Sequence, residues 1–253
     1  MVQLKHGLRE KKTLSLVNPV HMDKKFALAV FVSGSGSNLQ AIIDAIEENK
    51  TDTTKGLANA SVALVISSRD GVYALERAKK HNINGMVIGK NETDMLLDAL
   101  KSHNIDGIVL AGYLSILPSE IVDTYKNKII NIHPALLPMF GGKGFYGMRV
   151  HQAVIESGEK YSGASVHIVD GGIDTGAVLA RYVVAVLPTD TPESLQKKII
   201  EIEHDLLVTV VGAFTNGEID ELMKKPLLKT NEDNIEIVNS YILGLGERCS
   251  SKD

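Results

Sequence analysis

Cysteine and tryptophan are almost absent from this chain of 253 residues, which has one cysteine, Cys249, and no tryptophan. A single cysteine excludes an internal disulfide and the cysteine clusters that hold structural zinc. Cys249 lies in the polar stretch 246–253 and is therefore a poor candidate nucleophile. No apolar run approaches the roughly 20 residues that span a bilayer, so we expect no membrane partner.

Neither sign of charge dominates the chain. The 27 Lys and Arg residues face 31 Asp and Glu residues, for a net charge of −4. The chain has no overall positive charge that would attract nucleic acid, so we expect no nucleic-acid partner. A small anionic substrate, however, needs only local positive potential. The lack of disulfides fits a reducing compartment, and we expect a cytoplasmic location.

The length fits one large α/β domain. Residues 1–25 are polar and basic and lack the apolar core of a signal peptide. We expect residues 1–21 to form a disordered N-terminal extension, residues 22–225 to form one catalytic domain, and residues 226–253 to form a C-terminal tail.

Apolar runs alternate with helical patterns over the first half of the domain. The continuous apolar run 26–32 is typical of a strand buried on both faces, and a Ser/Gly loop and an amphipathic pattern over 38–48 follow it. Further strands are expected at 61–66, 85–88, 107–111 and 128–132, with helices at 72–80, 92–102 and 118–125. Such alternation predicts an α/β fold, a mostly parallel sheet with helices on both faces.

The pattern changes after residue 133. A helix is expected at 149–157, and the β-rich runs 164–169 and 177–186, joined by a Gly-rich connection, predict an antiparallel hairpin. A long helix then runs to about residue 214. Thr191 is a suitable N-cap for it, and Pro192 suits its first position.

The most informative stretch is Asn131-Ile132-His133-Pro134. Side chains two apart on a strand point the same way, so Asn131 and His133 should face one spot at the end of the strand 128–132. Pro134 favours extended geometry at His133 and ends the pairing soon afterwards. An amide donor beside a titratable ring suits an acyl-transfer site, whereas His133 alone would more often be structural.

Other candidates are ambiguous on local grounds. The loop Gly34-x-Gly36 precedes a helix and could bind phosphate or form a tight turn; it matches neither the dinucleotide fingerprint nor a P-loop. Asp174 could be functional or a turn aspartate. His167, in an apolar strand, favours a core role, and His151 near a helix start is uninformative. There is no HExxH motif or Cys/His cluster, so we expect no metal site.

Together these segments resemble the folate-dependent glycinamide ribonucleotide (phosphoribosylglycinamide) formyltransferases of de novo purine biosynthesis. The resemblance covers about residues 26–215 and is carried by 33–40, 75–78, 111–113, 131–138, 165–167, 173–176 and Glu203-His204. It implies a Rossmann-like formyltransferase fold. It also implies transfer of the formyl group of the co-substrate 10-formyltetrahydrofolate to the amine of 5'-phosphoribosylglycinamide, without a metal.

The resemblance also assigns residues to roles. The catalytic trio would be Asn131, His133 and Asp174, with Asp174 holding His133 in its charged form. The ribonucleotide would be bound by Gly36, Ser37, Asn38 and Glu203. The folate would be bound by Leu114, Ile116, Leu117, Val169 and Asp170.

The chain departs from the family pattern in three places, one of which is a connection from Ile88 to Ile105 that is shorter than in the best-known members and has no arginine. Ser115 stands where some members have an arginine, so a cation for the folate's glutamate tail is missing or supplied elsewhere, with Lys90 as one candidate. The segment 141–147 is longer than usual and could flank either ligand or form a variable surface loop. The sequence does not fix the oligomeric state; a homodimer is compatible with it.

Three alternatives stay open. A formyltetrahydrofolate hydrolase shares the trio but uses water as acceptor; it normally has an N-terminal regulatory domain, for which the residues before Phe26 are too few. A methionyl-tRNA formyltransferase has an added C-terminal β domain and a basic surface. A non-catalytic nucleotide-binding module would not need all three trio residues.

Overall fold

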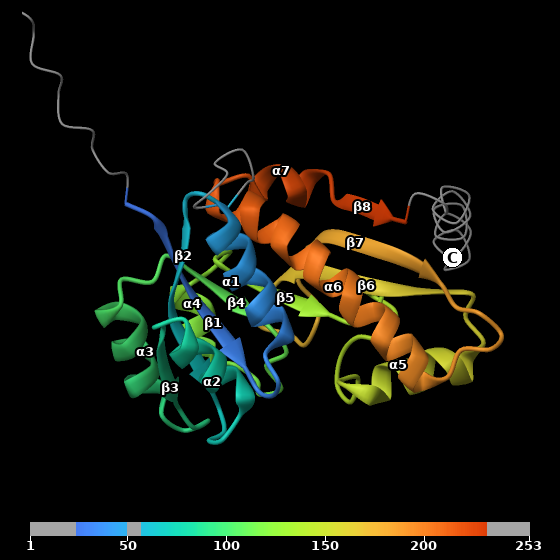
Figure 1. Cartoon of the computed structure of the whole chain (residues 1–253), viewed down its shortest axis with the longest axis horizontal. Coiled ribbons are helices and arrows are strands. Elements are labelled where there is room, and N and C mark those ends of the chain that lie inside the picture. The colour runs from blue at the N-terminus through green and yellow to red at the C-terminus, as the bar shows by residue number, and fades with distance from the viewer. Residues whose placement is uncertain (1–23, 50–56, 232–253) are drawn as a thin grey trace, which may run out of the picture.

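A mixed sheet forms the centre of the computed structural model, which describes residues 24–49 and 57–231. Its eight strands lie in the order β3-β2-β1-β4-β5-β6-β7-β8 (Figure 1). Pairing is parallel from β3 to β5 and between β7 and β8, and antiparallel at β5–β6 and β6–β7. The strands are β1 (Phe26–Val32), β2 (Ala60–Ser67), β3 (Asn84–Val87), β4 (Gly107–Leu110), β5 (Ile129–His133), β6 (Tyr161–Ile168), β7 (Val178–Ala185) and β8 (Leu227–Thr230).

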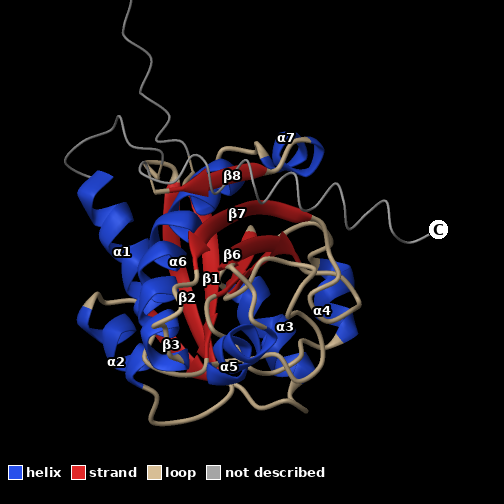
Figure 2. Cartoon of the chain, turned by 90° about the vertical axis from the view of Figure 1, so that its right-hand side faces the viewer, coloured by secondary structure: helices blue, strands red, loops and turns tan. Residues whose placement is uncertain are grey.

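Helices cover both faces of the sheet (Figure 2). One face packs against α1 (Ser37–Asn49), α2 (Tyr73–Lys80), α5 (Met148–Ser157) and α6 (Pro192–Thr215). The other face packs against α3 (Thr93–Ser102) and α4 (Ser119–Thr124). The short α7 (Ile219–Lys224) follows α6 and leads into β8. The expected α/β class, with a mostly parallel sheet and helices on both faces, is confirmed.

Strand β1 is apolar without interruption because it is buried on both faces of the sheet. From Leu28 to Val32 every residue is fully buried. Leu28, Val30 and Val32 belong to the core under α1 and α6, whereas Ala29 and Phe31 belong to the core under α3. Alternate side chains of a strand point to opposite faces, so a strand covered on both sides must be apolar at every position.

The order of the strands places a crevice beside β1. The chain runs outward from β1 through β2 to β3 and then returns to β4 on the other side of β1. In parallel α/β sheets, ligands bind at the carboxyl ends of the strands where the order reverses in this way. Here the loops after β1 and β4 meet, and the Leu114 N–H donates to Ser33 Oγ at 2.9 Å.

The hairpin expected from the two β-rich runs is confirmed as the antiparallel pair β6–β7. The antiparallel pairing of β5 with β6 was not anticipated. The expected tail boundary at residue 226 cuts the sheet, because β8 pairs with β7 from Leu227 to Thr230. An edge strand of four half-buried residues leaves too weak a pattern to find in the sequence. The expected extension 1–21 and Cys249 lie outside the described residues.

Thr191 should anchor the N-terminus of α6, as the sequence predicted. Its Oγ1 accepts the Ser194 N–H, while Ser194 Oγ accepts the Thr191 N–H. We expect Thr191→Ala to lower the free energy of unfolding by about 1 kcal/mol, because the Ser194 N–H loses Thr191 Oγ1 as its acceptor. Urea denaturation measures the loss. Thr189→Ala, at an exposed position two residues earlier, is the control, and equal losses in both variants would contradict the capping role.

Candidate active site

Asn131 and His133 lie at the carboxyl end of β5, and β6 holds both from the side. The antiparallel register sets Asn131 opposite His167 and His133 opposite Ser165. Ser165 is fully buried; its hydroxyl donates to the Ala135 carbonyl (2.7 Å) and accepts the Leu137 N–H (3.0 Å). The chain after His133 is therefore fixed by a serine that the sequence indicated only as part of the family resemblance.

The His133 ring is only 4% exposed. Its Nε2 lies 2.8 Å from the Phe140 carbonyl oxygen, which can only accept, so Nε2 carries the proton. Its Nδ1 faces Asp174 Oδ2 at 3.6 Å and is the nitrogen that can take up a second proton. Burial lowers the pKa of His133, and although Asp174 and the Phe140 carbonyl raise it, it stays below its ordinary value. The lowered pKa favours the neutral ring in the free protein.

Asp174 joins the loop after β6 to both histidines. Its Oδ2 accepts the Gly142 N–H at 2.9 Å, and its Oδ1 lies 3.5 Å from His167 Nε2. Burial raises the pKa of Asp174, but the hydrogen bond from His167, the charge of His133 and the Gly142 N–H outweigh it, so the pKa lies below its ordinary value. The carboxylate is thus ionised at neutral pH and available to stabilise a charge on either ring.

His167 is both a core residue and part of the site. It is 2% exposed, and its Nδ1 donates to the Ile168 carbonyl at 2.8 Å. In the neutral ring Nε2 accepts from Asn131 Nδ2 at 3.0 Å, and in the protonated ring it can instead donate to Asp174 Oδ1 at 3.5 Å. The sequence favoured a core role for His167. Its contact with Asn131 becomes visible only once β5 is known to pair with β6.

The long segment 141–147 contacts the catalytic candidates through its backbone. The Phe140 carbonyl accepts from His133, and the Gly142 N–H donates to Asp174. Gly141 has no room for a side chain, since a Cβ there would lie 2.4 Å from Leu137 Cδ2. The start of this segment therefore flanks the trio, whereas Lys143, Gly144, Tyr146 and Gly147 are exposed.

His151, near the start of α5, also approaches the trio. It is 2% exposed, and its Nδ1 has no hydrogen-bond partner among the described residues. Burial first, and then the charge of His133, lower its pKa to about 4. The ring is therefore neutral at physiological pH and supplies no charge to the site.

The loop after β1 leads into α1 through Gly36. This residue has a positive φ of 72°, and a Cβ on it would lie 2.6 Å from Ala74 Cβ in α2. Only glycine fits both demands. The first-turn N–H groups at Ser37 and Asn38 have no carbonyl one turn earlier to bind, which makes the start of α1 suitable for an anion.

Asn38 and Glu203 form a buried pair between α1 and α6. Asn38 Nδ2 donates to Glu203 Oε2 at 3.1 Å, and each residue is 7% exposed. Burial raises the pKa of Glu203 to about 7, although the Asn38 hydrogen bond lowers it. Asn38 Oδ1 is buried and has no partner among the described residues. The four residues expected to bind the ribonucleotide are thus adjacent in space.

The residues expected to bind folate divide into two groups. Leu114 and Ile116, in the loop after β4, are 55% and 74% exposed, whereas Leu117 is buried and Val169 packs beside it. Asp170 Oδ1 accepts from the Gly172 N–H and the Thr175 hydroxyl, so it shapes the turn that carries Asp174. The hydrogen bond from Thr175 is the main cause of the lowered pKa of Asp170.

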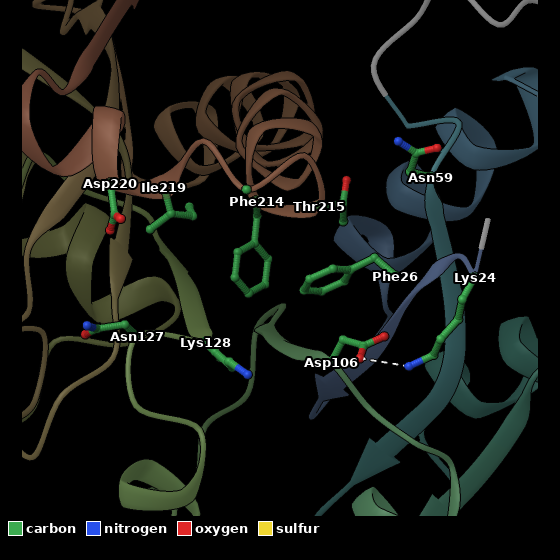
Figure 3. Close-up of a pocket in the computed structure, with 11 residues that line it drawn as sticks. Lys24, Phe26, Asn59, Asp106, Asn127, Lys128, Phe214, Thr215, Ile219 and Asp220 are labelled. Carbon is green, nitrogen blue, oxygen red and sulfur yellow. Dashed lines mark hydrogen bonds and ion pairs between the residues drawn. The ribbon is translucent and has the colours of Figure 1, made fainter.

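A cavity of about 650 Å³ opens at the opposite edge of the sheet (Figure 3). Phe26, Asp106 and Lys128, at the amino ends of β1, β4 and β5, line it. Lys24 pairs with Asp106 at 3.1 Å, and Phe26 packs edge-on against Phe214. None of the expected site residues lines this cavity, so we treat it as separate from the candidate site.

Residues 24–49 and 57–231 contain neither a metal-binding cluster nor a membrane-spanning helix. No group of three or more His, Cys, Asp or Glu side chains in this part is arranged to hold a metal ion. Among the helices formed by these residues, none is long and apolar enough to cross a bilayer.

Comparison with known proteins matches the formyl transferase model to residues 26–211. The chain belongs to this family. Its relatives within the family include the chloroplastic phosphoribosylglycinamide formyltransferase of Arabidopsis thaliana, 38% identical over 228 residues, which are 87% of this chain and 73% of the relative. The phosphoribosylglycinamide formyltransferase of Haemophilus influenzae is 35% identical and covers 76% of this chain and 88% of its own.

Solved structures of formyl transferases have the same fold. Glycinamide ribonucleotide transformylase 1 from Geobacillus kaustophilus is 36% identical, with a TM-score of 0.68 over 76% of this chain and 99% of its own. The corresponding enzyme from Symbiobacterium toebii is 31% identical, with a TM-score of 0.70 over 81% and 94%. A formyltetrahydrofolate deformylase from Pseudomonas syringae, 22% identical with a TM-score of 0.68 over 77% and 63%, shares the fold alone.

His167 should position the trio. We expect His167→Gln to lower kcat by about 100-fold with a small change in KM, because Asn131 and Asp174 lose their shared partner and shift. The pH profile should also change, since the ring helps to set the pKa of Asp174. Steady-state kinetics between pH 5.5 and 9 measure both effects. His103→Gln, on the far side of the fold after α3, is the control; a fall in stability alone, with kcat and profile unchanged, would refute the role.

Glu203 should make stability depend on pH. The pKa of Glu203 in the folded protein, about 7, lies above its ordinary value of 4.5. The protonated carboxyl therefore supports the fold fully below pH 4.5, and this support is lost as pH rises to 7. The loss is about 3 kcal/mol by linkage. We expect the stability difference between Glu203→Gln and the wild type to grow between pH 5 and pH 7.5 in urea denaturation. A difference independent of pH would contradict the raised pKa.

Proposed function

We propose that this protein transfers the formyl group of 10-formyltetrahydrofolate to the amine of 5'-phosphoribosylglycinamide, a step of de novo purine biosynthesis. The observation that carries the proposal is the convergence of Asn131, His133 and Asp174 at the carboxyl end of β5, in a chain of the formyl transferase family. The names of the full-length relatives support the choice of acceptor.

Attack of the amine on the formyl carbon creates an oxyanion and a positive nitrogen. Asn131 has a second amide N–H besides the one that faces His167, and we assign it to the oxyanion. The amine proton passes to His133 Nδ1, where the Asp174 carboxylate stabilises the charge. The bond from the formyl carbon to N10 then breaks, and the proton is delivered to N10 of the departing tetrahydrofolate.

The two substrates are assigned to different loops around the carboxyl end of β5. The ribonucleotide phosphate binds at the start of α1, at Ser37 and Asn38, and Glu203 contacts the ribose. The folate lies against Leu114, Ile116 and Leu117 in the loop after β4, and against Val169 and Asp170. Both ligands are small molecules, and the reaction as proposed uses no metal, nucleic acid or membrane. A cytoplasmic location and a homodimer stay predictions.

A formyl-transfer assay tests the proposal. Purified protein with 10-formyltetrahydrofolate should release tetrahydrofolate only when 5'-phosphoribosylglycinamide is added. Equal release without the ribonucleotide would overturn the proposal and favour a hydrolase. We expect His133→Ala to lower the rate by about 10²- to 10⁴-fold, because the proton acceptor is lost. Asp174→Asn should retain ligand binding while turnover falls, whereas a binding module would have no turnover to lose.

A further inference from the structure

We infer that Arg69 binds the carboxylates of the glutamate tail of the folate, and so makes the protein prefer donors that carry this tail. The inference rests on the proposed function for the identity of the ligand. It rests on the contacts of Arg69, Ser33, Ser68 and the loop after β4 for the location of the site.

Arg69 stands beside the loop that is assigned to the folate. Its Nη2 donates to the Ser33 carbonyl at 2.6 Å, and the hydroxyl of the same Ser33 accepts the Leu114 N–H at 2.9 Å. One residue earlier, Ser68 Oγ accepts from Ser115 Oγ at 3.1 Å. The end of β2 and the loop after β4 are thus joined across the end of β1 by two independent contacts.

The backbone of Arg69 is held in place, while most of its guanidinium is free. The Ser67 hydroxyl donates to the Arg69 carbonyl (2.7 Å) and accepts the Arg69 N–H (3.1 Å). A guanidinium has five N–H donors, and the contact with Ser33 uses one of them. Among the described residues no carboxylate lies within ion-pair distance of Arg69. An exposed cation on a fixed backbone, with donors to spare, suits a carboxylate ligand.

The neighbours of Arg69 specify an amphipathic ligand. Leu114 and Ile116, on the loop that it adjoins, are exposed apolar side chains. An apolar patch next to a guanidinium fits a molecule with a flat aromatic body and an anionic end. The proposed donor has this form, since its aminobenzoyl ring is followed by a glutamate with two carboxylates. Ser115 supplies only a hydroxyl, so the positive charge at this site comes from Arg69, which follows β2.

Lys90 is the weaker candidate because it follows β3. In the order β3-β2-β1-β4 it lies two strands from β1, whereas Arg69 lies one strand away. Adjacent strands are about 4.8 Å apart, so Lys90 starts three strand spacings from β4, whereas Arg69 starts two spacings away. Lys90 is exposed and has no hydrogen bond to that loop among the described contacts, which makes it a matched control.

Equilibrium binding tests the inference without using turnover. Calorimetric titration would compare tetrahydrofolate with tetrahydropteroate, which lacks the glutamate. We expect the wild type to bind tetrahydrofolate about tenfold more tightly. Arg69→Gln, which keeps a neutral donor near Ser33, should abolish this preference and leave tetrahydropteroate binding unchanged. Arg69→Lys should restore part of it, and Lys90→Gln should keep it.

Any other result of these binding titrations overturns the inference. A wild type without preference shows that no tail site exists. Equal weakening of both ligands in Arg69→Gln, or its failure to fold together with Arg69→Lys, shows that Arg69 only supports the loop. Loss of preference in Lys90→Gln assigns the tail to Lys90. A preference that depends on Arg69, together with no transfer to the ribonucleotide, would instead refute the proposed function and retain the tail site.

Discussion

The Asp174 carboxylate is the contact on which the rest of the site depends. One oxygen faces His133 and accepts the Gly142 N–H, and the other faces His167. Through His167 it also reaches Asn131. Strand β5, the loop that follows it and β6 are therefore positioned by one ionised group. Because its partners keep the pKa of Asp174 low in spite of burial, the negative charge is present before any substrate arrives.

The residues assigned to the ribonucleotide, Asn38 and Glu203, lack the full set of partners that Asp174 has. Glu203 is buried with a single hydrogen-bond partner, and its pKa is raised to about 7. Asn38 keeps a buried oxygen without a partner among the described residues. Unsatisfied buried groups cost stability, so this arrangement is poor for the fold alone. It is reasonable where a ligand with hydroxyl groups supplies the missing partners. The two parts of the site thus differ. The polar groups around Asp174 have partners without a ligand, whereas Asn38 gains its missing partner from the ligand.

The layers of the fold could be predicted because each follows from a local pattern. The uninterrupted apolar run of β1 and the Thr191-Pro192 start of α6 are read from neighbouring residues. Asn131 and His133 were found for the same reason, since their spacing on one strand is local. The pairing of β5 with β6, which brings His167 to Asn131, depends on contacts 36 residues apart. Strand β8 was missed because its four half-buried residues have no strong pattern. The lowered pKa of His133 could not be predicted, because its main cause is burial, which cannot be read from a motif.

The hydrogen bond from His133 to the Phe140 carbonyl limits which substitutions can change the tautomer of His133. The acceptor is a backbone oxygen, at a residue with a positive φ of 53°. No single substitution at Phe140 removes that oxygen, so the tautomer of His133 is set by the path of the chain and not by any side chain. A substitution at Gly141 is the more disruptive change, because a Cβ there would lie 2.4 Å from Leu137 Cδ2 and displace the chain that carries this carbonyl.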